Sequence, residues 1–407
     1  MKILQIHNFY QIPGGEDSVV KAERSLLESR GHVVIPYYKH NNTIKAYGLS
    51  EKIRFLCDAL YSNKTVSELR RIAKDEMPDV AHIHNVFPLI SPSAYYAFRS
   101  FNIPIVQTIH NYRFLCPSAT FYKKKSICRS CIRGNTLHCF FSRCYKGSFI
   151  LSALYSVLFL VHRHAGTFRN NVDLFIALNN FTKNLFINCG FPDEKIMIVR
   201  NFLPNSQFEQ LPEKESYAVY IGRLSQEKGL WTLLSAVKKV NGLRIKILGI
   251  GELEQRLRDY VKQNEMTQVE FKGFVFGPDK MDILRKAVFS IVPSEWYESF
   301  GIVVLESFAA GTPVIASNIG GLPELVDDGK SGLLFRPGDA DDLAEKMGKM
   351  LRDPGKTREM GLYARGQVEQ KYNQQTHYEE LLDVYNAAIG NEKGACNGLG
   401  HMARKTR

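Results

Sequence analysis

The sequence runs through one rhythm twice. Short apolar runs, each long enough for a strand, alternate with longer stretches in which apolar residues recur at helical spacing. The rhythm stops at 201–216, a stretch with two prolines and no periodicity, and then starts again. Strands that alternate with helices form βαβ units, which build a parallel sheet covered by helices on both faces. The sequence therefore predicts an α/β protein of two doubly wound domains, 1–200 and 217–373, joined by a linker.

Short apolar runs mark the predicted strands: 2–7, 33–37, 80–84, 105–110, 173–177 and 195–200 in the first domain, and 217–222, 244–248, 269–271, 289–292 and 314–316 in the second. Predicted helices include a single one over 52–74. A last helix, 374–390, is expected to pack back on the N-terminal domain, before a tail at 391–407. Ligands of such sheets bind at the carboxyl ends of the strands, so the cleft between the two domains is the expected site.

Positive charge is concentrated in one stretch. The whole chain has a net charge of +12, and residues 80–172 hold eleven Lys or Arg without a single Asp or Glu. A solvated face usually mixes both signs, so we expect this stretch to meet an anionic partner. Its core, about 112–147, is predicted to be a cysteine-rich basic insertion in the first domain. An apolar content of 44% with 23% charged residues excludes intrinsic disorder.

No signal peptide is recognised, because the opening apolar run is short and is predicted to be the first strand. The longest apolar stretch, 149–161, is shorter than the about 20 residues that cross a bilayer. We therefore expect a cytoplasmic protein whose eight cysteines are reduced unless they bind metal.

The sharpest motif places two carboxylates around a predicted helix start. In the segment PSEWYESFGIVVLE, Glu298 follows the strand 289–292, and Glu306 lies about two turns into the next helix. The helix start at 299–301 offers unpaired N–H groups and the positive end of the helix dipole, which together bind phosphate. The pattern predicts a phosphate site flanked by carboxylates. Glu306 as an ordinary surface residue is the alternative, although its apolar surroundings favour burial.

Three more segments follow predicted strands. Arg223 and Lys228, in IGRLSQEKG, are cations suited to a diphosphate. Gly14-Gly15 and the NIGGLPE segment at 318–324 offer backbone that a ligand can approach closely. A plain turn explains a lone Gly-Gly equally well. The lack of a G-x-G-x-x-G with a ribose-binding acid after it argues against a nicotinamide-dependent oxidoreductase.

Five of the eight cysteines fall within 29 residues: Cys116, Cys128, Cys131, Cys139 and Cys144. The C-x-x-C pair at 128 and 131 is typical of a zinc site, which a second pair usually completes. The spacing does not match a standard zinc finger. Reduced cysteines in a loop, or a disulfide formed on purification, are the alternatives.

The segments GRLSQEKG, ESFGIVVLE, AAGTPVIAS, GGLPELV and YNQQTHYEELLDVY occur in this order. With them the chain resembles, over nearly its whole length, the retaining glycosyltransferases of family 4, of the type that assembles bacterial surface polysaccharide such as capsule or lipopolysaccharide. The resemblance implies a GT-B fold of two Rossmann-like domains facing a cleft. It also implies a hexosyltransferase that uses a UDP- or GDP-sugar. A sugar phosphorylase or synthase of the same fold, and a zinc-stabilised nucleic-acid-binding protein, remain alternatives.

The resemblance also assigns roles to single residues. Arg223 and Lys228 would hold the diphosphate, Glu298 would lie by the donor sugar, and Glu306 would bind the ribose hydroxyls. The remaining contacts to the donor would come from the backbone around Phe300 and Gly301, from Gly15, and from His110, the last as a second catalytic residue beside Glu298. Without the family, a lone histidine at a strand end is more often structural.

The family implies transfer with retention, assisted by the leaving phosphate. A metal-binding D-x-D is the mark of the competing GT-A fold, and its one candidate, Asp339–Asp341, is interpreted as a helix N-cap. Catalysis is therefore expected to need no metal. A subgroup of the family with LCP, C-x-x-C and RCY segments favours Cys116, Cys128, Cys131 and Cys144 as ligands of a structural zinc, with Cys139 as an alternate.

The last expectation concerns the acceptor. A helix over 149–161 would bring Phe149, Leu151, Leu154, Leu158 and Val161 close to one side, with Arg143, Lys146, Arg163 and Arg169 flanking it. Such a helix suits the interface of an anionic membrane, and a core helix is the alternative. We expect a peripheral protein on the inner face of the cytoplasmic membrane, a glycan or polyprenyl-diphosphate-linked acceptor, and no nucleic-acid partner.

Overall fold

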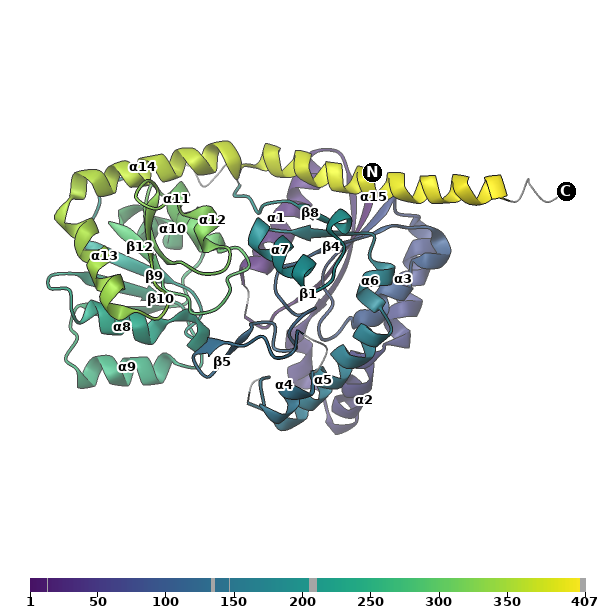
Figure 1. The fold of residues 1–407 in the computed structure, drawn as a ribbon, viewed down its shortest axis with the longest axis horizontal. Helices are drawn as coiled ribbons and strands as arrows, with labels where there is room; N and C mark the ends of the chain where they lie inside the picture. The colour runs from purple at the N-terminus through teal and green to yellow at the C-terminus, as the bar shows by residue number, and fades with distance from the viewer. Residues whose placement is uncertain (13, 133–135, 146, 205–210, 403–407) are drawn as a thin grey trace. The chain divides into compact units, whose positions relative to one another are not determined.

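The computed structural model of the protein describes residues 1–407 apart from 13, 133–135, 146, 205–210 and 403–407, and it describes only the backbone at 49, 53 and 391–402. Part of the predicted linker and the predicted basic residues Arg133 and Lys146 thus lie outside the described residues. The chain divides into two compact units (Figure 1). The first holds Met1–Thr120, Arg129–Arg200 and His377–Arg407, and the second holds Phe121–Cys128 and Asn201–Thr376.

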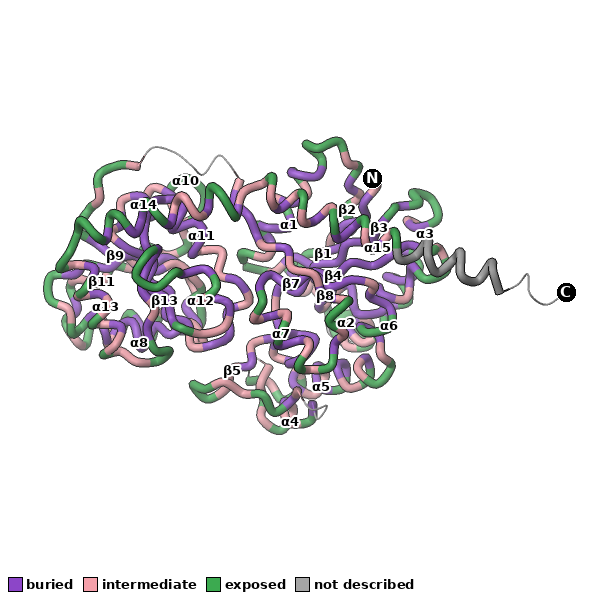
Figure 2. Tube along the Cα trace, turned by 45° about the horizontal axis from the view of Figure 1, so that its top comes forward, coloured by how far each residue is buried: buried purple, intermediate pink, exposed green. Residues whose placement is uncertain are grey.

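The first unit is built on a six-stranded parallel sheet in the order β2-β1-β3-β4-β7-β8. Its strands are β1 (Lys2–Phe9), β2 (Val33–His40), β3 (Val80–Asn85), β4 (Ile105–Thr108), β7 (Leu174–Ala177) and β8 (Ile196–Ile198). Helices cover parallel sheets on both faces, which is why the central strands are buried along almost their whole length. Figure 2 shows the central strands β1, β3, β4 and β7 as mostly buried segments.

The helices of the first unit are α1 (Gly15–Ser29), α2 (Leu49–Leu60), α3 (Asn63–Glu76), α4 (Leu137–Phe141), α5 (Phe149–His164), α6 (Thr167–Asn171), α7 (Asn180–Asn188) and α15 (Gln374–Met402). The single helix predicted over 52–74 is wrong, because the chain breaks between α2 and α3. Ser62 is the N-cap of α3 and thereby starts a second helix: its hydroxyl accepts a hydrogen bond from the backbone N–H of Thr65 at 3.2 Å.

The last helix returns to the first sheet. Leu381, Val384, Tyr385 and Ala388 of α15 are buried in one apolar cluster with residues of β1, β3, β4 and β7. Helix α15 extends to Met402, so residues 391–402, which the sequence analysis assigns to a tail, are helical. The glycines at 390, 394, 398 and 400 favour an earlier end, because glycine is about 1 kcal/mol less favourable than alanine inside a helix.

The second unit holds a six-stranded parallel sheet in the order β11-β10-β9-β12-β13-β14. Its strands are β9 (Tyr217–Ile221), β10 (Arg244–Leu248), β11 (Val269–Gly273), β12 (Phe289–Val292), β13 (Val314–Ser317) and β14 (Gly332–Phe335). Its helices are α8 (Leu230–Val237), α9 (Glu254–Gln263), α10 (Gly277–Lys286), α11 (Ile302–Ala309), α12 (Leu322–Leu325), α13 (Ala340–Arg352) and α14 (Pro354–Lys371). With two doubly wound units the α/β class predicted from the sequence is confirmed.

A short antiparallel hairpin, β5 (Tyr122–Lys123) and β6 (Ser126–Ile127), belongs to the second unit although its sequence lies within the first half of the chain. It comes from the cysteine-rich stretch, which the sequence assigns as a whole to the first domain. The side chains of the hairpin explain the difference. Phe121 packs edge-on against Tyr297, with ring centroids 6.2 Å apart, and the Tyr122 hydroxyl donates to Glu295 at 2.7 Å.

Helix α5 has two apolar faces. Tyr155, Leu158 and Phe159 are buried, whereas Ile150, Val157 and Val161 are 68%, 47% and 44% exposed. The predicted exposed side is therefore wrong for Leu158, which belongs to the core. Arg163 is also not a surface flank, because its guanidinium donates to the backbone carbonyls of Leu115 and Cys131. Among the described residues, no helix is long and apolar enough to cross a membrane.

Candidate functional site

The strand order of the second sheet points to one place at its edge. The chain runs outward from β9 through β10 to β11, and then returns to place β12 on the other side of β9. Loops at the carboxyl ends of β9 and β12 thus diverge in opposite directions, which leaves a crevice where ligands bind in open α/β sheets. The two loops are 222–229 and 293–301, and they contain five of the predicted site residues: Arg223, Lys228, Glu298, Phe300 and Gly301.

Lys228 and Glu298 meet at this switch point. The Lys228 ammonium lies 2.5 Å from Oε1 of Glu298, and the same oxygen accepts from the Ser294 hydroxyl at 2.6 Å and from the indole N–H of Trp296 at 2.9 Å. Glu298 is 6% exposed. Burial alone would raise its pKa, but the charge and hydrogen bond of Lys228 and the two neutral donors outweigh burial and lower it. Glu298 is therefore a carboxylate at neutral pH.

The two loops are locked together by backbone contacts. The N–H of Glu295 donates to the carbonyl of Glu227 at 2.9 Å, and Gly229 lies so close to the Pro293 carbonyl that a Cβ would be 1.8 Å from its oxygen. The Glu295 carboxylate accepts from Thr232 of α8 and from Tyr122 of the hairpin, both at 2.7 Å. The sequence gives no signal for the role of Tyr122, because its partner lies far along the chain.

The NIGGLPE loop supports Glu298 from the other side. Gly320 has a φ of +64°, and a Cβ there would lie 2.6 Å from the backbone nitrogen of Glu298. The next N–H, of Gly321, donates to the Glu298 carbonyl at 2.9 Å. Gly301 caps α11 with a φ of +99°, a conformation that favours glycine. The glycines of this loop thus allow two backbone segments to touch behind the carboxylate.

The remaining predicted residues of this unit have partners of their own. Arg223 is 59% exposed on its side chain and pairs with Glu227 at 3.2 Å. Glu306 is buried on α11 and pairs with Lys280 of α10 at 2.5 Å, while Phe300 is buried edge-on to Tyr372. The Asp339 carboxylate accepts from the N–H groups of Asp341 and Asp342, so it caps α13 as the sequence interpretation has it.

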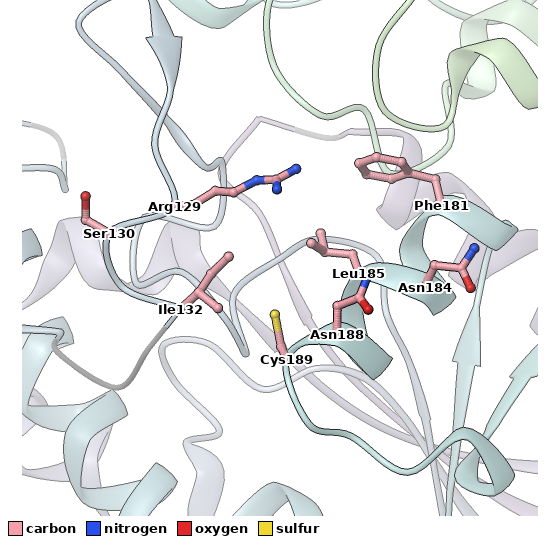
Figure 3. A pocket seen from close by; sticks show the side chains of 8 residues that line it. All are labelled: Arg129, Ser130, Ile132, Phe181, Asn184, Leu185, Asn188 and Cys189. Atoms are coloured by element: carbon pink, nitrogen blue, oxygen red, sulfur yellow. The ribbon is translucent and has the colours of Figure 1, made fainter.

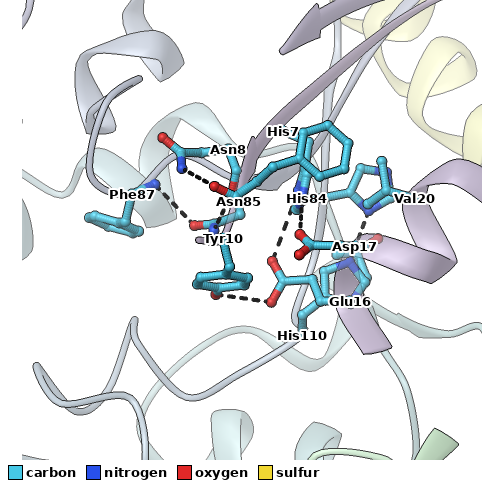
Figure 4. A network of polar contacts seen from close by, with 12 residues as sticks. His7, Asn8, Tyr10, Glu16, Asp17, Val20, His84, Asn85, Phe87 and His110 are labelled. Atoms are coloured by element: carbon cyan, nitrogen blue, oxygen red, sulfur yellow. Dashed lines mark hydrogen bonds and ion pairs between the residues drawn. The ribbon is translucent and has the colours of Figure 1, made fainter. Parts of the chain in front are cut away.

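In the first unit the corresponding switch point lies between β1 and β3. Gly15 is the exposed first residue of α1, and the first turn of this helix carries the acids Glu16 and Asp17. The Asp17 carboxylate accepts from His7 of β1 at 2.8 Å (Figure 4). His110 follows β4 and is 8% exposed, and its Nε2 lies 2.9 Å from Nδ1 of His84.

Glu16 is the most perturbed acid of this loop. Its Oε2 accepts from the Tyr10 hydroxyl at 3.1 Å and from the Asn111 amide at 3.4 Å, and its side chain is about one-tenth exposed. Burial and then the charge of Asp17 raise its pKa to about 8, against the lowering effect of those donors. The sequence singled out the glycines of this GGED segment and missed the acid beside them.

The cysteine-rich segment contains a thiol pair. The pKa of Cys139 is raised, first by a hydrogen bond with Cys144 and then by burial. The Cys116 thiol lies 3.1 Å from the Ser118 hydroxyl, and Cys128 is half-buried in the hairpin of the other unit. Cys139, predicted as an alternate ligand, is thus the buried member of the pair that the structure forms.

A cavity of about 740 Å³ lies beside the same segment (Figure 3). Arg129, Ser130 and Ile132 line one side, and residues of α7 and its end line the other: Phe181, Asn184, Leu185, Asn188 and Cys189. No predicted site residue is among them.

Two family models match the chain. One, described as glycosyltransferase family 4, matches residues 13–206, and the other, glycosyl transferases group 1, matches residues 202–367. The two sheets and their order are those of a GT-B fold. The chain belongs to the family 4 glycosyltransferases of the GT-B fold. Glu298, Lys228 and Arg223 lie in the part that matches the group 1 model, and Gly15 and His110 in the part that matches the family 4 model.

Curated relatives of this glycosyltransferase are similar over part of their length. An uncharacterized glycosyltransferase of Methanocaldococcus jannaschii is 30% identical over 49% of this chain and 55% of its own. The putative colanic acid biosynthesis glycosyltransferase WcaL of Salmonella typhimurium is 30% identical over 52% and 56%. The chain spans about half the length of the first curated relatives it matches. A Klebsiella pneumoniae protein from a cps region is 25% identical over 78% of this chain and 84% of its own.

Solved structures share the fold. Sucrose-phosphate synthase of Thermosynechococcus elongatus has a TM-score of 0.73 at 18% identity, over 96% of this chain and 99% of that one. Anabaena HepE, in a complex with UDP-glucose, has a TM-score of 0.67 at 18% identity, over 95% and 100%. At this identity the likeness establishes the fold alone.

The pKa of Glu16 predicts a pH-dependent stability. A carboxyl that binds its proton more tightly when folded makes the protein lose stability as pH rises from the ordinary pKa of Glu, 4.5, to about 8. Glu16→Gln cannot ionise, so its free energy of unfolding should gain on the wild type across this window, by at most about 1.4 kcal/mol per pH unit. Urea denaturation between pH 4 and pH 9 measures the difference. Glu28→Gln, exposed on the same helix, is the control; a difference for Glu16→Gln that stays flat contradicts the assignment.

Proposed function

We propose that the protein transfers a hexose-type sugar from a nucleotide-diphosphate sugar to a glycan or lipid-linked glycan, with retention at the transferred carbon. The observation that carries the proposal is the Lys228–Glu298 pair at the β9–β12 switch point, in front of the N-terminus of α11. A cation, a buried carboxylate and the N-terminal end of α11 gather there, and together they suit a charged diphosphate joined to a polar sugar. The matches to glycosyltransferase families support the same reading.

The chemistry asks for two kinds of charge. A departing nucleoside diphosphate gains negative charge, and Arg223, Lys228 and the N–H groups at the start of α11 can stabilise it without a metal ion. The sugar carbon gains positive charge, and the ionised Glu298 can hold the sugar on the side away from the diphosphate. The acceptor oxygen bonds to the sugar carbon on the face from which the diphosphate departs. As the bond to the diphosphate breaks, a phosphate oxygen takes the proton of the acceptor hydroxyl. Glu306 on α11 is proposed to receive the ribose hydroxyls, with Lys280 as its partner in the free protein.

UDP is the first nucleotide to test, since HepE of the same fold was solved with UDP-glucose. We expect Lys228→Ala and Arg223→Ala each to weaken UDP binding by about 1.5–3 kcal/mol, because each removes a charge-assisted hydrogen bond. Glu298→Gln should leave UDP binding nearly intact and lower turnover by orders of magnitude. Isothermal calorimetry with UDP and GDP, and a screen of radiolabelled UDP- and GDP-sugars with and without EDTA, measure these effects.

Lys238→Ala is the matched control, because Lys238 is an exposed lysine at the end of α8 that bonds Asn264. Unchanged UDP affinity in both cation variants would remove those residues from the site. Binding of a duplex oligonucleotide in place of any nucleotide would favour the nucleic-acid-binding alternative. Release of a sugar phosphate in the presence of inorganic phosphate would favour a phosphorylase of the same fold.

The acceptor is proposed to reach the protein at an anionic membrane surface, on the inner face of the cytoplasmic membrane. The support is the exposed apolar stripe of α5, namely Ile150, Val157 and Val161, next to the exposed side chains of Phe149 and, on α4, Phe141. Arg143 lies with its guanidinium 5.7 Å from the Phe149 ring centroid, at the edge of this stripe. Apolar side chains with a cation at their edge suit a polyprenyl-diphosphate-linked acceptor and the lipid around it.

Removing the stripe should therefore abolish vesicle binding. The triple variant Ile150→Gln, Val157→Gln and Val161→Gln is expected to stay in the supernatant with anionic vesicles at low salt, where the wild type sediments. Phe276→Gln, 72% exposed in the second unit, is the control and should sediment like the wild type. A triple variant that still sediments, or a wild type that binds neither anionic nor neutral vesicles, would speak for a soluble acceptor.

A structural zinc is proposed for the cysteine-rich segment, with Cys139 and Cys144 as two of its ligands and Cys131 as a third. The hydrogen bond between Cys139 and Cys144 supports these two as ligands. In the described part of the chain, no three cysteine sulfurs lie within 4.8 Å of one another, so Cys131 would have to move closer to complete the site. Elemental analysis of fresh, reduced protein should find about one zinc per chain. Cys139→Ser should lose it, and Cys57→Ser, exposed on α2, should keep it. Protein without metal would leave the pair as plain thiols.

A further inference from the structure

A carboxylate is buried among imidazoles in the core of the first unit. Glu23 of α1 is 2% exposed, and its Oε1 lies 3.1 Å from Nδ1 of His82 and 3.2 Å from Nε2 of His84. The two histidines are two positions apart in β3, so they face the same side of the sheet. The other carboxylate oxygen, Oε2, lies 3.5 Å from Nε2 of His377, near the start of α15. These four residues form the histidine cluster.

The Glu23 carboxylate needs a positive charge close by. Burial alone would raise its pKa, but His82 and His84 lower it well below its ordinary value, so Glu23 is ionised at neutral pH. Among the described residues, no Lys or Arg nitrogen lies within 4.0 Å of it, and its ion-pair contacts are all to histidines. A buried carboxylate is stable when it is paired with a cation or binds a metal ion. The countercharge must therefore come from a protonated imidazole or from a metal.

The Gln5 amide shows what His84 presents to this carboxylate. The Gln5 carbonyl accepts from the Tyr38 hydroxyl, which fixes the orientation of the amide. Its nitrogen donates to Oε1 of Glu23 at 3.2 Å and to Nε2 of His84 at 3.4 Å, so Nε2 carries a lone pair. Burial lowers the pKa of His84 to about 4, so at pH 7 its ring is neutral and its proton is on Nδ1, 2.9 Å from Nε2 of His110. Two acceptors, Oε1 and Nε2, thus face each other at 3.2 Å, as two ligands of one metal ion do.

The histidines of the cluster all have the outer ring nitrogen, the one that faces away from Glu23, bonded to another group. The partners are the Thr108 hydroxyl for His82 at 2.7 Å, Nε2 of His110 for His84 at 2.9 Å, and the Arg200 carbonyl for His377 at 2.7 Å. Metal-binding histidines are held in the same way, because a bond at the outer nitrogen orients the ring and leaves the inner lone pair for the metal.

The spacing of the inner atoms also fits a transition metal. Imidazole nitrogens and carboxylate oxygens bind zinc at about 2.0–2.2 Å, so two ligands of a tetrahedral ion lie about 3.3–3.6 Å apart. The two distances from Oε1 of Glu23, 3.1 and 3.2 Å, are just below this range, and the three ligand atoms lie within 4.8 Å of one another. Two donors would turn away on binding: the Gln5 amide, which also reaches the Val20 carbonyl at 3.4 Å, and the Tyr385 hydroxyl, 2.8 Å from Nδ1 of His82.

We propose that Glu23, His82 and His84 bind a divalent transition-metal ion, with His377 as an outer partner of the Glu23 carboxylate. Two imidazoles and one carboxylate form a ligand set that suits first-row metals such as iron(II). The ion would join α1 to β3 inside the first unit. The site is separate from the zinc proposed for the cysteine-rich segment, whose ligands are thiols, and it does not rest on sugar transfer.

Cobalt(II) tests the site, because its absorption spectrum reports the ligand atoms. Reduced protein without a histidine tag is stripped with a chelator and titrated. The cluster should bind about one cobalt per chain and give ligand-field bands without thiolate charge transfer, and these bands should persist in Cys139→Ser. Loss of a ligand, in Glu23→Gln or His84→Gln, should weaken binding more than the roughly 10- to 100-fold that loss of an outer partner costs, and His377→Gln should fall within that range.

Two substitutions in the same unit are the controls. Glu68→Gln changes a carboxylate that accepts from Tyr37 at 2.6 Å and from Lys39 at 3.1 Å, and His164→Gln changes an exposed histidine of α5. Both variants should bind cobalt like the wild type. A wild type without these ligand-field bands, or bands that Glu23→Gln leaves unchanged, would overturn the proposal, and the cluster would then hold protons in place of a metal.

A variant outside the ligand set guards against loss of the fold. Thr108→Val keeps the shape of the side chain and every ligand, and it removes only the outer partner of His82. Cobalt binding that is weaker by roughly 10- to 100-fold supports the site, whereas unchanged binding contradicts His82 as a ligand. These results stand whether or not any sugar donor is turned over, so failure of the proposed function and failure of the metal site are told apart.

Discussion

The site of this protein depends on one property of parallel sheets: every strand ends at the same edge. Lys228 and Glu298 are 70 positions apart in the sequence, and they touch because β9 and β12 are neighbours whose following loops leave from one edge. The carboxylate at their junction is ionised because a lysine, a serine and an indole share it. The glycines of the NIGGLPE loop only let the backbone close in behind it. Sheet order thus comes first, and the charge pair follows from it.

The sequence predicts local features well, because local features have local causes. Strand–helix alternation predicts the two doubly wound units, and the interpretation of Asp339–Asp341 as a helix N-cap agrees with Asp339 capping α13. The break at Ser62 was missed since the apolar periodicity runs through it, and Leu158 was placed on the wrong side of α5 because that helix is apolar almost all round. The identity of the buried face of such a helix is decided by tertiary neighbours that no periodicity encodes.

The histidine cluster marks a different limit. His82 and His84 are two positions apart in β3, a spacing that places them on one face of the sheet, and the sequence analysis did not use it. Their partners could not be read from it, because Glu23 lies on another helix and His377 near the end of the chain. Tyr122 shows the same limit in the second unit: a hairpin of the basic stretch supplies a hydroxyl to Glu295, and only the folded chain reveals it.

The return of α15 to the first sheet has a consequence for the order of events on the ribosome. The first 200 residues contain all the strands of the first unit. Until α15 is synthesised, however, the apolar cluster that Leu381, Val384 and Tyr385 complete remains exposed to water, and Glu23 lacks its contact with the imidazole of His377. The second unit, being contiguous apart from its hairpin, is complete before those residues are synthesised. The first unit thus finishes folding only after the second unit has been synthesised, because the residues of α15 that complete its core follow the second unit in the sequence.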